Sequence, residues 1–226
     1  MSRAVVFGQA SYLHVHSLLF ALAEKGVAYR LQPADTMPIP PTKDGRSAAA
    51  REPALEVGSK LVRGAESALR FVEDGFLGPR LQPEDPFERA QMNRALEIHY
   101  REAVITIGSR IVNRYLAAII TSEWIDPAPA ESVLHDARRT VESFKEILGP
   151  GPFIAGRQFS LADIAVACLF DNIMELEEGS VVVPDGTPMR NWWNRVRVRE
   201  AFMATRPKAG ALFGLVESFW AGDNSG

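Results

Sequence analysis

FIAGRQFSLADIA, residues Phe153–Ala165, is the stretch of this chain that says most about its fold. Ser160 can accept a hydrogen bond from the backbone N–H three residues on, and the carboxylate of Asp163 can reach back to the N–H of Ser160. An acidic side chain in the first turn also suits the positive end of a helix dipole. The stretch therefore predicts a helix that begins at Ser160, and the apolar residues after it extend this helix to about Glu175.

Helical patterns dominate the chain around this segment. Apolar side chains recur three or four positions apart, which is the spacing of one helix face. This spacing predicts further helices at residues 87–121, residues 129–148, a segment through Trp192, Trp193 and Val196, and residues 209–220. Since no strand pattern interrupts them, residues 87–226 are expected to form an all-helical domain.

The first 78 residues mix strand and helix patterns instead. The expected order is a strand at residues 4–7, a helix at 14–25, a strand at 27–33, a hairpin of residues 53–57 and 61–63, and a helix at 66–75. Residues 34–52 are expected to be mostly loop. This βαβ(α)ββα order predicts a small α/β domain over residues 1–78, and the proline-rich residues 79–86 predict a linker.

Composition excludes several classes of protein. The chain has 226 residues, of which 46% are apolar and 23% charged, so it can build a full core and is not a disordered protein. A net charge of −3 disfavours nucleic-acid binding. The single cysteine cannot form an intramolecular disulfide or a thiolate zinc site. Without an apolar run near 18 residues, we expect a soluble, cytoplasmic protein with no membrane contact.

Several of these segments resemble the glutathione S-transferase superfamily, and they occur in the order that the family has. Gly156 and Phe159, joined to the Ser160–Asp163 box, are similar to the entry of the family's buried helix. Weaker similarities are the first strand and helix, Glu52–Leu55, the linker at Leu81–Asp85 and the segment Arg190–Val196. The resemblance implies an α/β plus all-α fold: a thioredoxin-like N-terminal domain (βαβαββα) followed by a C-terminal helical bundle.

The resemblance implies that the α/β domain binds glutathione as a co-substrate and lowers the pKa of its thiol. A hydroxyl hydrogen bond and a helix N-terminus both stabilise a thiolate. In related proteins the activating group lies a few residues after the first strand, and in this chain the slot falls on Tyr12, with Ser11 beside it. The alternative is that Tyr12 packs over the loop while Ser11 caps the helix.

Three further positions complete the glutathione site that the resemblance implies. Pro53 occupies the place of a cis-proline, which leaves the backbone of Glu52 free to pair with a peptide-like ligand. Glu66 and Ser67 match the pair that binds the γ-glutamyl end. Counting from Pro53, however, places the pair nearer residues 64–65, and taking Glu66 and Ser67 as the pair puts Arg70 where the family has a buried isoleucine. Otherwise Glu66 and Ser67 cap a helix.

Candidate substrate contacts are expected on the side of the cleft that faces the helical domain: His14, Tyr100, Arg110, Arg114 and Tyr115. Arg110 and Arg114 could bind a carboxylate or an anionic substrate, and the alternative is that they form interdomain or dimer salt bridges on a solvated face. No metal site is expected, because His14 and His16 lie two residues apart and have no metal-spaced partner. Cys168 is expected to be a small core residue.

These expectations combine into a homodimeric transferase that conjugates the glutathione thiol to a small hydrophobic electrophile. A different class of function is also open, because one fold hosts many functions. The alternative is a non-catalytic, transferase-like binding or scaffold protein with weakened glutathione affinity. The departures around Tyr12 and around Glu66–Ser67 favour that alternative.

Overall fold

A computed structural model describes residues 4–37, 53–115 and 129–207 of the chain. Its N-terminal part is a four-stranded sheet of order β2-β1-β3-β4. The strands are β1 (Ala4–Phe7), β2 (Tyr29–Gln32), β3 (Ala54–Val57) and β4 (Lys60–Arg63). β1 pairs parallel with β2 and antiparallel with β3, and β3 pairs antiparallel with β4. This topology confirms the thioredoxin-like N-terminal domain that the sequence predicts.

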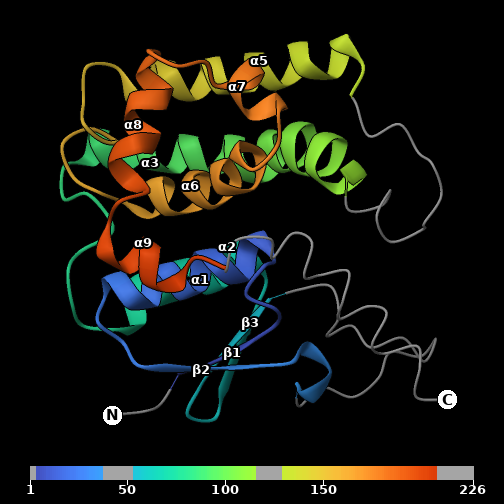
Figure 1. The fold of residues 1–226 in the computed structure, drawn as a ribbon. Helices are drawn as coiled ribbons and strands as arrows, with labels where there is room; N and C mark the ends of the chain where they lie inside the picture. The colour runs from blue at the N-terminus through green and yellow to red at the C-terminus, as the bar shows by residue number, and fades with distance from the viewer. Residues whose placement is uncertain (1–3, 38–52, 116–128, 208–226) are drawn as a thin grey trace, which may run out of the picture.

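Helices α1 (Leu13–Glu24) and α2 (Ala65–Gly75) lie between the sheet and the helical layer, as Figure 1 shows. The alternation along β1 explains this arrangement, because successive strand residues face opposite sides of a sheet. Val6 joins the main core that includes α1 and α2, whereas Val5 and Phe7 pack with Met37 on the other face. A short 3-10 helix, η1 (Ala34–Thr36), follows β2.

Strand register brings three loops to one end of the sheet. Phe7, the last residue of β1, lies opposite Ala54, the first residue of β3. The backbone N–H of Gly64 then donates to the carbonyl of Pro53 over 3.1 Å, so the start of α2 lies beside the start of β3. The loop after β1, Pro53 and the first turn of α2 therefore converge at this end, which we call the loop end of the sheet.

The rest of the described chain is helical. Its elements are α3 (Pro86–Ile98), the π-helix η3 (His99–Val112), α5 (Glu131–Leu148), α6 (Leu161–Met174), α7 (Glu178–Val182), α8 (Pro188–Val196) and α9 (Glu200–Thr205). α6 is almost entirely buried and contacts α1, α3, η3, α7 and α8. α9 packs beside α1 (Figure 1). One continuous hydrophobic core joins the α/β and helical parts.

Asp163 holds the start of α6 in place, and the capping box that the sequence predicts is confirmed. Its buried carboxylate accepts hydrogen bonds from the N–H and the hydroxyl of Ser160, each over 2.9 Å. It also accepts from the N–H of Ile154 over 2.9 Å and from Nε1 of Trp192 over 2.8 Å. One side chain thus joins three segments of the helical domain.

The structure differs from the sequence prediction in three places. Residues 87–121 were expected to form one α-helix, but a π-helix follows α3. Buried residues recur there at intervals of four, such as His99, Ala103 and Ile107, a spacing that an α-helix also shows. Helices α7 and α9 were not expected, because they are too short to show a period. The helix predicted at 209–220 lies outside the described residues, as do 38–52.

The α/β elements end at Gly75, and the helical elements begin at Pro86. This agrees with a linker between them, while the exact division into domains 1–78 and 87–226 stays a prediction. No helix in the described ranges is long and apolar enough to cross a membrane.

Candidate functional site at the loop end of the sheet

The turn from β1 into α1 is built on Gly8. Its φ is +141°, and a Cβ added there would lie 2.4 Å from Cγ2 of Val15. Only glycine fits such a conformation and such a close approach. Gly8 therefore lets α1 begin directly above the end of β1, with residues 9–12 as the connecting loop.

The backbone N–H groups at the N-terminus of α1 are available to a ligand, because no acidic side chain lies in the first turn of this helix. Tyr12 is the N-cap residue, no side chain caps the helix, and no acidic residue lies in its first turn. Within the described part of the chain, neither Ser11 nor Tyr12 makes a side-chain hydrogen bond, and Tyr12 is 46% exposed. The alternative that Ser11 caps this helix is therefore not what the structure shows. A partial positive charge and two free hydroxyls suit an anion such as a thiolate.

Glu66 and Ser67 lie at the same end of the sheet, in the first turn of α2. Gly64 is the N-cap residue of this helix and no side chain caps it, so the capping alternative for Glu66 and Ser67 is not observed. Glu66 is instead held by Arg70, whose Nη2 lies 3.0 Å and whose Nε lies 3.1 Å from Oε1 of Glu66. Arg70 Nη1 also donates to Oδ1 of Asn93 on α3, over 3.2 Å.

Pro53 is placed beside this turn by the hydrogen bond from Gly64. Glu52, the other residue of the expected backbone contact, lies outside the described residues. The Glu52–Pro53 peptide bond involves that residue, so the cis-proline at this position stays a prediction.

Three aromatic rings pack together where α1 meets η3. Tyr100 of η3 lies 5.7 Å from the ring of His14 and 4.8 Å from the ring of His99, centroid to centroid. Burial raises the pKa of Tyr100, and the nearby carboxylate of Glu66 raises it further, so the phenol stays protonated. Burial also lowers the pKa of His14 to about 4 and that of His99 to about 3, so both imidazoles are neutral near pH 7.

The remaining candidate contacts belong to the helical domain. Arg110 Nη1 lies 2.7 Å from Oδ2 of Asp136 on α5, and the Tyr115 hydroxyl donates to Oε1 of Glu178 on α7 over 2.6 Å. Arg114 is also engaged in an interaction. Acidic partners on α5 and α7 thus hold Arg110 and Tyr115, and a contact of either residue with substrate stays a prediction. The ion pair of Arg110 joins η3 to α5 within the helical part, so it is not the interdomain or dimer salt bridge that the alternative expected.

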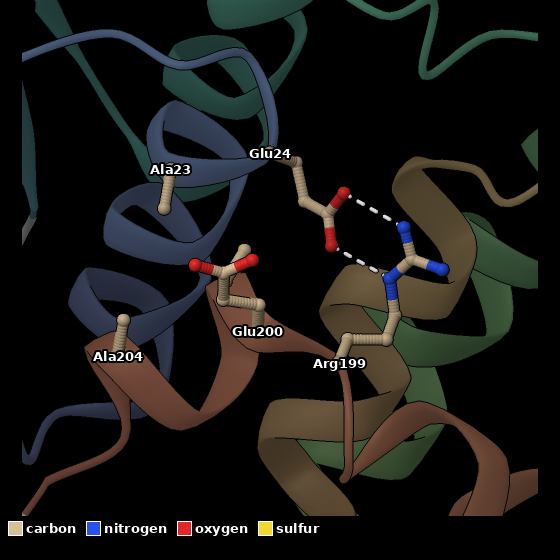
Figure 2. A pocket seen from close by; sticks show the side chains of 6 residues that line it. Ala23, Glu24, Arg199, Glu200 and Ala204 are labelled. Carbon is tan, nitrogen blue, oxygen red and sulfur yellow. Dashed lines mark hydrogen bonds and ion pairs between the residues drawn. The ribbon is translucent and has the colours of Figure 1, made fainter.

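A pocket lies at the other end of α1, away from the loop end of the sheet, and the sequence carried no signal for it. Figure 2 shows this cavity of about 600 Å³, lined by Ala23, Glu24, Arg199, Glu200, Ala201 and Ala204. Arg199 makes a two-pronged pair with Glu24, over 2.6 and 2.8 Å, and its guanidinium lies 3.9 Å from the centroid of the Phe159 ring. The pair joins α1 to the start of α9, so Arg199 has a structural role.

Sequence reasoning did not find that Arg70 pairs with Glu66, or that His99 is buried against the ring of Tyr100. Arg70 had a signal, because it stands where the resemblance expects a buried isoleucine. His99 had none, since nothing in the spacing of the long helix distinguishes a cleft-facing imidazole from a buried one. Within the described residues, no group of three or more His, Cys, Asp or Glu side chains could hold a metal ion.

Comparisons with known proteins agree with this architecture. Residues 110–200 match the family model "Glutathione S-transferase, C-terminal domain". Glutathione S-transferase F14 of Arabidopsis thaliana is 22% identical over 157 residues, which are 68% of this chain and 61% of that protein. The match thus spans less than two thirds of this curated relative.

Solved structures are similar over nearly the whole chain. Glutathione transferase F2 from Populus trichocarpa has a TM-score of 0.73 at 20% identity, covering 95% of this chain and 99% of that one. A theta-class glutathione S-transferase from Xanthomonas axonopodis pv. citri, with glutathione bound, has a TM-score of 0.67 at 20% identity. It covers 92% of this chain and 99% of that one.

A thioredoxin-like sheet domain joined to a helical bundle is the fold of glutathione S-transferases, and this chain has that fold. Residues 110–200 are similar to the C-terminal domain of the family. The resemblance to the glutathione S-transferase superfamily that the sequence predicts is therefore confirmed.

Proposed function

We propose that this protein is a glutathione-dependent transferase that conjugates the glutathione thiol to a small hydrophobic electrophile. The observation that carries the proposal is the N-terminus of α1. It is uncapped, lacks an acidic neighbour in its first turn, and carries the Ser11 and Tyr12 hydroxyls at the loop end of the sheet. The glutathione-bound Xanthomonas structure of similar fold supports glutathione as the ligand.

Each part of the site has a role in this proposal. Ser11 or Tyr12 donates a hydrogen bond to the sulfur, and the helix dipole of α1 stabilises the negative charge. The backbone of Glu52, before Pro53, pairs with the cysteinyl part of the ligand. Glu66 and Ser67 bind the γ-glutamyl end. The sulfur then attacks an electrophilic carbon held against His14 and Tyr100.

Titration calorimetry with millimolar glutathione tests the binding step, and loss of a model electrophile in the presence of glutathione tests the chemistry. We expect heat from a single class of sites and electrophile consumption faster than in the protein-free control. The absence of both signals would overturn the proposal.

A second function is favoured by the contact between Glu66 and Arg70. Because Arg70 already neutralises Glu66, the ligand's ammonium group meets a weakened acceptor, as in a binding or scaffold protein that no longer holds glutathione strongly. In that case Arg70→Leu tightens glutathione binding in calorimetry, while the wild-type protein consumes no electrophile. Efficient turnover by the wild-type protein rejects this second function.

We also propose that the protein is a homodimer in the cytoplasm, as the resemblance implies. Light scattering of the purified chain measures its mass directly. A mass equal to the 24.9 kDa of one chain would overturn the dimer.

A further inference from the structure

The pocket at the C-terminal end of α1 has no part in the proposed transferase site. It lies between the last turn of α1 and α9, whereas Ser11 and Tyr12 precede the first turn of the same helix. Its volume of about 600 Å³ falls within the range of small-molecule sites, which is roughly 300 to 1,000 Å³. A pocket of this size can hold a small organic molecule.

Small side chains on two helices keep the pocket open. Ala23 on α1 and Ala201 and Ala204 on α9 line it, and each contributes only a methyl group. Ala201 and Ala204 face the pocket together, because residues three apart lie on the same side of a helix. Phe202 points to the other side of α9, where it is buried and packs on the ring of Phe20. The buried side of α9 therefore anchors this short helix, while the methyl groups of its other side form an apolar lining.

Glu24 and Arg199 form a charged wall of the pocket that is fixed in place. The side chain of Glu24 is only 9% exposed, and its two oxygens accept hydrogen bonds from Arg199 over 2.6 and 2.8 Å. The guanidinium of Arg199 also lies 3.9 Å from the centroid of the Phe159 ring. Because the opposite charges of Glu24 and Arg199 cancel, this wall adds little net charge to the pocket.

Glu200 carries the charge of the pocket that is not balanced. Within the described part of the chain, its carboxylate makes no hydrogen bond or ion pair with another residue. Figure 2 shows this carboxylate pointing toward α1, in the space between Ala23 and Ala204. A carboxylate beside apolar methyl groups attracts a cation and repels an anion.

We propose that this pocket binds a small organic ammonium ion, that is, an amine that is protonated at neutral pH and carries an apolar body. The ammonium group donates a charge-assisted hydrogen bond to the carboxylate of Glu200. The apolar body packs on the methyl groups of Ala23, Ala201 and Ala204, which removes its surface from water. Because the pocket is separate from the loop end of the sheet, this inference does not rest on the proposed transferase function.

An anionic ligand fits the same pocket less well. Arg199 is the cation of the lining, and Glu24 already accepts hydrogen bonds from its Nε and Nη2. If Arg199 turned toward an anion, the largely buried carboxylate of Glu24 would lose its partner, and an unpaired buried charge is costly. An ammonium ion requires no such change, because Glu200 is already available.

Titration of the protein with 2-phenylethylamine and with 2-phenylethanol tests the proposal, because the two molecules have nearly the same shape and only the amine is charged at neutral pH. Backbone amide chemical shifts, measured by NMR, report both affinity and location. For the amine we expect a dissociation constant of about 1 mM or lower, an ordinary affinity for about nine non-hydrogen atoms. The alcohol should bind at least about 10-fold more weakly. Equal affinities, or no binding of the amine, would overturn the proposal.

Two variants at exposed positions locate the site. Glu200→Gln removes the carboxylate and should weaken binding of 2-phenylethylamine about 3- to 10-fold. Ala204→Leu fills the pocket and should abolish the amine-induced shift of the Ala23 amide. Glu146→Gln is the matched control, because it removes an exposed carboxylate on α5, well separated from α9 in Figure 1, and it should change neither result. An unaltered affinity in Glu200→Gln, or amide shifts confined to the loop end of the sheet, would contradict the proposed site.

Discussion

At the scale of single residues, the loop after β1 carries the chemistry that the proposed function needs. Ser11 and Tyr12 are adjacent, both hydroxyls lack a hydrogen-bond partner within the described residues, and both precede an uncapped helix. The sequence left open which of them binds the sulfur. The structure keeps both available, so the two are best tested together.

The double variant Ser11→Ala/Tyr12→Phe should raise the pKa of the bound glutathione thiol toward the ordinary value of about 8.5. Because a thiolate is the reactive form, the rate at neutral pH should fall about 10- to 100-fold. Absorbance of the bound thiolate as a function of pH measures the pKa directly.

The matched control is Ser59→Ala/Tyr29→Phe, which removes the same atoms at the opposite end of the sheet. It should leave both the thiol pKa and the rate unchanged. An unaltered thiol pKa in Ser11→Ala/Tyr12→Phe would contradict the role assigned to this loop.

Asp163 gives a prediction about stability at the same scale. Asp163→Ala leaves the N–H groups of Ser160, Ile154 and Trp192 buried without an acceptor. We expect the free energy of unfolding to fall by about 3–5 kcal/mol, as measured by urea denaturation. Glu84→Gln removes an exposed carboxylate and should leave it unchanged. A loss no larger than that of the control would show that other groups satisfy these donors.

At the scale of elements, the close packing of the start of α1 against the end of β1, at Gly8 and Val15, positions the whole site. Gly8→Ala forces a Cβ into Val15 at a φ that alanine avoids, so α1 must move away from the sheet. We expect a loss of about 3 kcal/mol or more in urea denaturation, together with weaker glutathione binding.

Gly26→Ala is the comparison for this prediction. Gly26 has a φ of +66°, and nothing lies within 4 Å of an added Cβ. It should cost only about 1–2 kcal/mol, the ordinary penalty of a left-handed residue. Equal losses for the two variants would mean that the contact with Val15 relaxes freely.

At the scale of the whole molecule, three of the four histidines lie where α1 meets the helical domain. His14 and His99 contact each other's rings, and His16 packs on Phe202 with Arg206 nearby. Burial lowers the pKa of His14 to about 4 and those of His16 and His99 to about 3. In the unfolded chain the same groups titrate near the ordinary value of about 6.5.

Stability should therefore fall with acid in a defined window. The unfolded state binds more protons than the folded state between about pH 6.5 and pH 3, so each histidine costs stability as the pH falls through that range. The full effect is about 3 to 5 kcal/mol for each group. Above that window, the neutral imidazoles impose no such penalty.

His99→Leu tests this prediction, because it removes a buried group that acid would have to protonate. We expect the pH midpoint of acid unfolding, followed by circular dichroism, to move to lower pH. His135→Leu is the control, since His135 is exposed, and its midpoint should not move. An unchanged midpoint in His99→Leu would show that carboxylates dominate acid unfolding.

Much of this architecture could be predicted from local patterns. The strands, α1, α2, α5 and α6 begin within about two residues of their predicted starts, because alternation, helical spacing and capping residues are local signals. The resemblance to the glutathione S-transferase superfamily, and not these local signals, made Ser11, Tyr12, Pro53, Glu66 and Ser67 candidates. The π-helix was not predicted, because the spacing of its buried residues also fits an α-helix. The helices α7 and α9 were not predicted, because they are too short to show a period.

Contacts between distant residues decided the rest. The sequence alone predicted the order of the elements, since this order depends on neighbours along the chain. It also carried the resemblance to the superfamily, and that resemblance implied the hydroxyls proposed for the thiol. Only the tertiary structure paired Arg70 with Glu66, turned Arg110 and Tyr115 toward α5 and α7, and set the ring of Tyr100 beside that of His14. These partners lie on different elements, and no periodicity records which side chain meets which across a packed interface.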